Sequence, residues 1–287
     1  MTDRALLLIA HGSRDADARD EYARIREALA QRLSDEVVVF SVLEFPDQDH
    51  LPSIQEGWRR CVAAGARRVV VLPFFLFPAG HVRDDLPGEL EQARAKHLDA
   101  TLELLPPLGP AEELLDVLEE RAGQAIAQLA GDPDGLTAVV LVGAGTSDPD
   151  ANGDLCKVAR LLWERSPYPL VEVAWISLTT PNVRQAVDRC VALGARRIAL
   201  VPYFLNTGVL LRRIGPRLGP IRQQHPRLAI QVAPQIGPHP RLIDLLARRS
   251  REGLDGECRG HGWLAVCGRP SCTAVASARS RLLRAPT

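Results

Sequence analysis

The 287-residue sequence has no net charge, no long apolar run and only two lysines. Its 35 basic and 35 acidic residues cancel, so the charge does not indicate a nucleic acid or an anionic membrane as a partner. No apolar run approaches the roughly 20 residues of a membrane span. The first residues lack the basic start and long apolar stretch of a signal peptide. These absences predict a soluble, cytoplasmic protein that binds neither membranes nor nucleic acids.

The sequence also lacks an obvious disulfide pattern. Its six cysteines fit a reducing compartment. Cys258, Cys267 and Cys272 lie near the C-terminus together with His261, and they could hold a metal or an iron–sulfur cluster. No C-x-x-C pair is present, however, and the spacing matches no established cluster pattern. We therefore do not expect an iron–sulfur cluster in this tail.

Apolar strands alternate with amphipathic helices along the chain, and this alternation predicts parallel βαβ units. The apolar run Ala5–Ala10 is typical of a central strand that is buried on both faces. A Gly- and Asp-rich stretch at 131–135 is typical of a linker. We predict two tandem doubly wound, flavodoxin-like α/β domains at 1–130 and 136–250, followed by a cysteine-containing tail at 251–287.

The two halves of the chain are copies of each other. Residues 61–76, CVAAGARRVVVLPFFL, match residues 190–205, CVALGARRIALVPYFL, at an offset of 129. His11 aligns with Ala144 at an offset of 133, so the second copy is expected to have a loop four residues shorter before its second helix. The repeat provides an internal control, because structural residues should persist in both copies whereas site residues need to survive in only one.

Three polar residues with metal-binding chemistry are present only in the first copy. They are His11, which has no histidine counterpart, Glu44, which aligns with Ser177, and His81, which aligns near Val209. Each follows the carboxyl end of a predicted strand, and in a sheet of order 2-1-3 these ends are adjacent. Two imidazoles and one carboxylate form a site with open positions that suits Fe(II), Co(II) and similar ions. The alternative is that the two copies differ here by drift.

The segments LLLIAHGSRD, SVLE and FFLFPAGHVRDDLP together resemble the sirohydrochlorin chelatases, which have the class II chelatase-like fold. The resemblance covers about residues 4–250 and implies the long, internally duplicated form, with the active cleft between the two domains. It implies a lyase that inserts Fe2+ or Co2+ into sirohydrochlorin for siroheme or cobalamin synthesis. It also places the metal ligands at His11, Glu44 and His81, and the proton chemistry on the two histidines.

The substrate of that family carries eight carboxylates, so its cleft should present arginines and main-chain donors. Ser13 and Arg14 lie at a turn that opens a helix, where an anion is favoured. Together with Arg83 they are the predicted substrate-binding residues. Arg212 and Arg213 occupy the corresponding segment of the second copy and are further candidates.

Several alternatives stay open at this point. We expect no tightly bound cofactor, with the metal ion entering as a substrate, and the sequence does not choose between iron and cobalt. A non-catalytic metal-binding or metal-delivery protein could use the same three ligands. A phosphohistidine phosphatase ranks last, because that chemistry requires an arginine directly before the histidine, where Ala10 stands. A duplicated chain can form a cleft by itself, so a monomer is expected.

Overall fold

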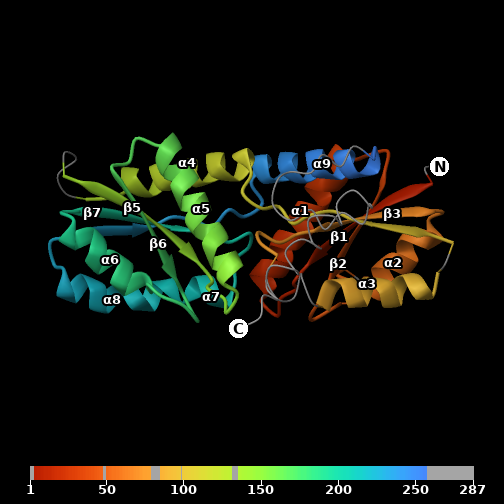
Figure 1. Cartoon of the computed structure of the whole chain (residues 1–287), viewed down its shortest axis with the longest axis horizontal. Coiled ribbons are helices and arrows are strands. Elements are labelled where there is room, and N and C mark those ends of the chain that lie inside the picture. Colours follow the sequence, from red (N-terminus) through yellow and green to blue (C-terminus); the bar gives the residue numbers. More distant parts are fainter. Residues whose placement is uncertain (1–2, 48–49, 79–84, 98, 131–134, 257–287) are drawn as a thin grey trace, which may run out of the picture. The chain divides into compact units, whose positions relative to one another are not determined.

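The chain forms two four-stranded parallel sheets with flanking helices (Figure 1). The computed structural model describes residues 3–47, 50–78, 85–97, 99–130 and 135–256. The predicted α/β class with two parallel sheets is confirmed. None of the helices in the described part of the chain combines the length and the apolar character needed to cross a membrane. The cysteines and His261 of the predicted tail lie outside the described residues.

The first sheet has the strand order β2-β1-β3-β4, and every neighbouring pair is parallel. Its elements are β1 (Arg4–Ala10), α1 (Ala16–Arg32), β2 (Val37–Val42), α2 (Ile54–Ala63), β3 (Arg68–Pro73), α3 (Leu86–Ala95) and β4 (Thr101–Leu104). Ala10 pairs with Val42, and Ile9 pairs with Pro73. The carboxyl ends of β2, β1 and β3 are therefore neighbours, as the predicted order 2-1-3 requires.

The second sheet repeats this order as β6-β5-β7-β8. The remaining elements are α4 (Glu112–Ala127), β5 (Thr137–Gly143), α5 (Pro149–Arg165), β6 (Leu170–Trp175), α6 (Val183–Ala192), β7 (Arg197–Pro202), α7 (Val209–Arg212), α8 (Ile214–Gln224), β8 (Ala229–Val232) and α9 (Pro240–Leu254). Helix α9 continues through residues 251–254, which the sequence had suggested to be the start of the tail.

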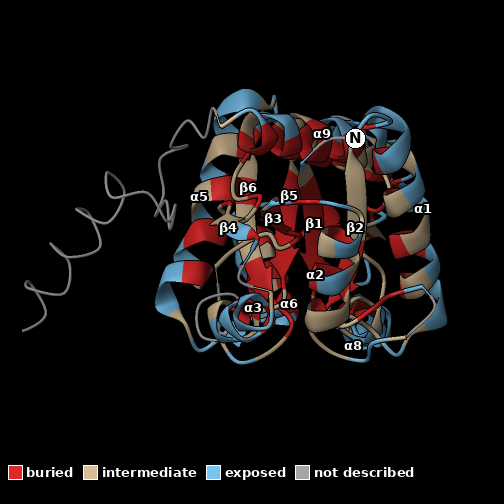
Figure 2. Cartoon of the chain, turned by 90° about the vertical axis from the view of Figure 1, so that its right-hand side faces the viewer, coloured by how far each residue is buried: buried red, intermediate tan, exposed pale blue. Residues whose placement is uncertain are grey.

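Each sheet has an apolar core against two of its helices, α2 and α3 in the first sheet and α6 and α8 in the second. In the first sheet, Leu7 and Ile9 of β1 pack with Trp58 of α2 and with Leu86 and Leu90 of α3. The second core repeats the arrangement between β5–β8 and helices α6 and α8. Figure 2 shows the central strands as buried, whereas the helices are buried mainly on one side. This burial pattern explains why the strands read as continuous apolar runs and the helices as amphipathic.

The structure confirms the four-residue difference between the copies. The Val42 N–H donates to the Pro52 carbonyl (3.0 Å), and the Trp175 N–H donates to the Pro181 carbonyl (3.0 Å). These equivalent bonds enclose nine intervening residues in the first copy and five in the second. The extra residues therefore lie between β2 and α2, in the loop that contains Glu44.

The chain divides into two compact units that exchange helices between the copies. Unit 1 comprises the described residues within Met1–Ser13, Arg26–Gly109 and Leu245–Thr287, and unit 2 comprises those within Arg14–Ile25 and Pro110–Asp244. Helix α4 follows β4 in sequence but contacts β7 and β8, and the second half of α9 belongs to unit 1. The predicted domains 1–130 and 136–250 therefore describe the sequence repeat, whereas the packing units are different.

One repeated arginine binds the carboxyl end of each exchanged helix. Arg68 of β3 donates to the carbonyls of Gly253 and Leu254 (both 2.6 Å), at the end of α9. Arg197, its counterpart in β7, donates to the Ile126 carbonyl (3.2 Å) at the end of α4. A cation at a helix C-terminus satisfies carbonyls that have no partner within the helix and interacts favourably with the helix dipole.

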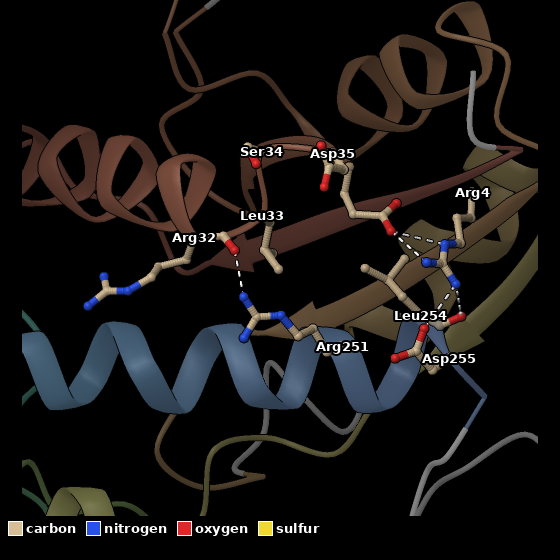
Figure 3. A pocket seen from close by; sticks show the side chains of 9 residues that line it. Arg4, Arg32, Leu33, Ser34, Asp35, Arg251, Leu254 and Asp255 are labelled. Carbon is tan, nitrogen blue, oxygen red and sulfur yellow. Dashed lines mark hydrogen bonds and ion pairs between the residues drawn. The ribbon is translucent and has the colours of Figure 1, made fainter.

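A second arginine strengthens the contact in unit 1. Arg4 donates to the Leu254 carbonyl (2.9 Å) and forms ion pairs with Glu36 (2.7 Å) and Asp255 (3.1 Å). Figure 3 shows these contacts beside a pocket of about 220 Å³, where Arg251 also donates to the main-chain carbonyl of Arg32 (2.6 Å). The groups that line this pocket are largely engaged with one another, which fits a role in docking α9.

We predict that Arg68→Leu destabilises the protein by about 2–4 kcal/mol, because it removes the donors at the end of α9. It also leaves the mostly buried Glu103 carboxylate without the guanidinium that pairs with it at 2.6 Å. Urea unfolding followed by circular dichroism measures the change. Arg67→Leu is the matched control, since Arg67 is exposed and should change stability by about 0.5 kcal/mol or less. Equal losses in the two variants would contradict the role given to Arg68.

Cys61 and Cys190 occupy equivalent positions in the two cores, so the reactivity of their thiols reports on the packing. Burial raises the pKa of Cys61 and of Cys190 from the ordinary 9.0 to about 12, and both side chains are fully buried. Because the thiolate is the reactive form, both residues should resist iodoacetamide at pH 8 until the protein is unfolded in urea. The exposed Cys156 serves as the internal reference in peptide mapping by mass spectrometry. Rapid native labelling of Cys61 or Cys190 would argue against the packing described here.

Candidate functional site

The candidate site lies at the carboxyl ends of the strands of the first sheet. His11 directly follows β1, and Glu44 follows β2 by two residues. The Glu44 N–H donates to the His11 carbonyl (2.8 Å), one step beyond the bond from the Leu43 N–H to the Ala10 carbonyl (3.0 Å). Both His11 and Glu44 are half-buried. The parallel ladder thus continues past the strands and fixes the main chain of these two residues side by side.

The third predicted ligand, His81, follows the end of β3 along the sequence. On the other side of β1, the Phe74 N–H donates to the Ile9 carbonyl (2.7 Å), so the chain leaves β3 at the same edge of the sheet. His81 and Arg83 follow in sequence, but both lie outside the described residues. Among the described residues, no group of three or more His, Cys, Asp or Glu side chains is arranged to hold a metal ion.

Gly12 makes the close approach between these two strand ends possible. Its φ is +95°, and a Cβ placed there would lie 1.9 Å from the Glu44 carbonyl oxygen. The second copy has the same geometry, since a Cβ on Gly145 (φ +83°) would lie 1.9 Å from the Ser177 carbonyl oxygen. No other residue fits a position with both a left-handed backbone and direct contact with a carbonyl.

The two copies share this backbone but carry different side chains. In the second copy the Ser177 N–H donates to the Ala144 carbonyl (3.0 Å), which is the counterpart of the bond between Glu44 and His11. The alignment of His11 with Ala144, and of Glu44 with Ser177, is therefore confirmed. The Ser177 hydroxyl also donates to the Ala144 carbonyl (2.9 Å). The second copy keeps the turn but has no imidazole and no carboxylate at these positions.

The chain matches the CbiX family model over residues 5–125 and 138–253, which correspond to the two sequence copies. The chain belongs to the CbiX family. It is 36% identical over 263 residues to the sirohydrochlorin cobaltochelatase of Priestia megaterium, covering 89% of this chain and 82% of the relative. It is 28% identical over 249 residues to the sirohydrochlorin ferrochelatase of Bacillus subtilis (strain 168), covering 87% and 91%.

Solved structures of chelatases have the same fold as this CbiX-family chain. The sirohydrochlorin chelatase SirB from Bacillus subtilis subspecies spizizenii, in complex with cobalt, matches with a TM-score of 0.73 at 27% identity, covering 88% of this chain and 96% of that chain. SirB from Bacillus subtilis with Fe3+ matches with a TM-score of 0.75 at 28% identity, covering 88% and 97%. The predicted recognition of a duplicated chelatase-like chain is confirmed.

The sequence predicted an open anion site at the start of α1 in this CbiX-family chain, and the structure differs. The Asp15 carboxylate accepts from the main-chain N–H of Asp17 (3.1 Å) and of Ala18 (3.4 Å), so it caps the helix. Arg212 in turn donates to both Asp15 (2.9 Å) and Asp17 (2.8 Å). The helix amides are therefore occupied by the protein itself. A helix-capping role for Asp15 was readable from the sequence, since Asp is a favoured N-cap residue.

Sequence reasoning also missed the residue that follows Glu44. Phe45 has φ +53° and its counterpart Leu178 has φ +62°, although neither is glycine. Both side chains are exposed, at 40% and 80%. A bulky residue in the left-handed region stores strain of about 1–3 kcal/mol. Its presence in both copies shows that the chain direction after the second strand is a fixed feature of the fold, and no residue type in the sequence signals it.

We predict that Gly12→Ala and Gly145→Ala each destabilise the protein by about 1–3 kcal/mol, because both combine a positive φ with a clash against a carbonyl. Gly88→Ala is the control: nothing lies within 4 Å of a Cβ at this position in α3, so it should be neutral or stabilising by up to about 1 kcal/mol. Urea unfolding of the three variants and the wild type measures these changes in stability. Wild-type stability in Gly12→Ala would refute the close approach of Gly12 to Glu44.

Proposed function

We propose that this chain is a sirohydrochlorin chelatase, a lyase that inserts Co2+ or Fe2+ into the tetrapyrrole for cobalamin or siroheme biosynthesis. The family match over both copies supports this function, as do curated chelatases that align over more than four fifths of both chains. The observation that carries the proposal is the difference between the copies at one shared backbone. His11 and Glu44 are joined there by a main-chain hydrogen bond, and their counterparts Ala144 and Ser177 supply neither an imidazole nor a carboxylate.

We propose that His11, Glu44 and His81 hold the incoming metal ion. Support for the first two comes from their adjacent main chains at the end of β1 and β2. Support for His81 comes from the sequence, which places it after β3, the strand on the other side of β1. Two imidazoles and one carboxylate leave coordination positions open for the nitrogen atoms of the substrate.

The chemistry of metallation favours this ligand set. The free macrocycle must lose two inner N–H protons as the metal enters, so the site needs a loosely held divalent ion and a nearby base. Neutral imidazole can act as a ligand or accept a proton near pH 7, and we assign both roles to His11 and His81. The Glu44 carboxylate supplies negative charge that holds the cation. Thiolate ligands would bind the ion too tightly for transfer.

We assign the substrate carboxylates to Ser13, Arg14 and Arg83. Because Asp15 occupies the first amides of α1, Ser13 and Arg14 would act through their own side chains and not through the helix N-terminus. Arg14 is exposed. Arg212 is a poorer candidate than the sequence suggested, since its guanidinium pairs with two aspartates.

Metal insertion should be tested with both Co2+ and Fe2+. Relatives named as cobaltochelatases and as ferrochelatases are both similar to this chain, at 36% and 28% identity. The three ligands suit either ion. We further propose that the protein acts as a monomer in the cytoplasm, since one chain already contains both copies of the repeat.

We predict that His81→Ala and His11→Ala each reduce metal insertion by at least about 100-fold, because each removes a ligand and a proton acceptor. The measurement is the change in sirohydrochlorin absorbance when Co2+ or Fe2+ is added under anaerobic conditions. His50→Ala is the control, since His50 is exposed and is not among the proposed ligands.

Two results would contradict this proposal at different levels. Full activity of folded His11→Ala and His81→Ala would refute the site but leave the reaction standing. A wild-type protein that binds Co2+ but neither binds nor metallates sirohydrochlorin would refute the reaction and indicate a metal carrier.

A further inference from the structure

Unit 2 contains a cavity of about 500 Å³ at the carboxyl end of β6, a volume typical of small-molecule sites. Its walls come from the loop after β6, the start of α6 and one side of α8. The polar lining includes Ser177, Thr179, Asn182, Arg184 and Arg217. Among the described residues, two arginines and no acidic side chain line the cavity, so its charge favours an anion.

Arg217 has hydrogen-bonding capacity that the described protein does not use. Its Nη2 donates to the Ile176 carbonyl (2.8 Å), at the edge of the cavity. Its Nη1 is buried and has no hydrogen-bond partner among the described residues. Leaving a buried charged donor unsatisfied destabilises the folded protein. An acceptor atom of a bound ligand would remove that cost.

Arg184 is in an unfavourable position for the fold itself. It is the second residue of α6, where the helix dipole disfavours a cation. It forms a long ion pair with Asp188 (3.8 Å), and that carboxylate also contacts His225 (2.7 Å). The fold gains little from Arg184, so the residue fits a binding role better than a structural one.

The first copy has uncharged or acidic residues at the positions equivalent to Arg184 and Arg217. The buried residues of α3 and α8 align Arg217 with Glu89, and the N-caps of α2 and α6 align Arg184 with Gln55. In the first copy the Gln55 side-chain amide donates to the Glu89 carboxylate. A mutually satisfied pair in one copy is thus replaced by two cations in the other.

The helix N-terminus does not contribute to the site. The Asn182 side chain accepts from the Gln185 N–H (3.0 Å), and Gln185 accepts from the Asn182 N–H (2.9 Å), so a capping box occupies these amides. The positive groups of the cavity are therefore the two guanidinium groups. Leu178, which is 80% exposed, adds an apolar surface at its edge.

We propose that this cavity, the Arg184–Arg217 pocket, is a carboxylate-binding site. Guanidinium groups bind carboxylates through paired charge-assisted hydrogen bonds. Arg217 lines this cavity and has a buried donor nitrogen without a partner among the described residues. The carboxylate can belong to a side chain of the tetrapyrrole or to a small free polycarboxylate. Only the first source rests on the function proposed above.

The test uses the full-length protein and two probes, metal-free sirohydrochlorin followed by its fluorescence and tricarballylate followed by calorimetry. The main variant is Arg184→Gln combined with Arg217→Glu, which installs the pair found at Gln55 and Glu89. Arg222→Leu is the control, because Arg222 also lies on α8 and donates to a carbonyl (3.4 Å) but does not line the pocket. Arg184→Gln alone replaces the double variant if that protein does not fold.

We expect the double variant to weaken binding of at least one probe about tenfold or more, with the control unchanged. Weaker binding of sirohydrochlorin identifies the tetrapyrrole as the source, and weaker binding of tricarballylate alone identifies a free polycarboxylate. Unchanged binding of both probes, or binding of neither probe by the wild type, overturns the pocket. Failure of wild-type metal insertion counts against the proposed function, and tricarballylate then tests the pocket separately.

Discussion

The parallel hydrogen bonds that β1 forms with β2 on one side and β3 on the other determine the rest of this structure. They align the carboxyl ends of three strands that are far apart in sequence. The ladder also continues beyond the last paired residues, through the bonds to the carbonyls of His11 and Ile9. Because the strands are buried on both faces, the sheet fixes the point at which each loop begins. The main-chain positions of His11 and Glu44 follow from this ladder.

The exchange of helices ties the stability of one copy to the other. Each sheet has a helix that comes from the opposite sequence copy, and the repeated arginine at Arg68 and Arg197 binds the end of that helix. The duplicated chain therefore folds as a pair of interdependent units.

The sequence predicted what depends on local pattern and on comparison between the copies. Apolar periodicity located the strands, and the change of offset from 129 to 133 located the longer loop around Glu44. The helix exchange was not predictable, because α4 has the same amphipathic pattern whichever sheet it covers. The left-handed backbone at Phe45 was missed because residue type gives no sign of it. The Arg184–Arg217 pocket joins residues from two helices, and only the fold brings them together.

Comparison of two copies separates structural from chemical requirements more sharply than either copy alone. Gly12 and Gly145 are both present because one backbone geometry demands glycine, whereas the residues before them differ. Where the backbone is the same in both copies but the side chain differs, the fold does not require that side chain, so function can determine it. The same reasoning applies in both directions. At the turn after β1 the first copy has His11 where the second has an alanine, and at the α6–α8 cavity the second copy has two arginines where the first has Gln55 and Glu89. The two copies therefore differ in complementary ways, with the proposed metal ligands in the first and the two arginines of the proposed carboxylate site in the second.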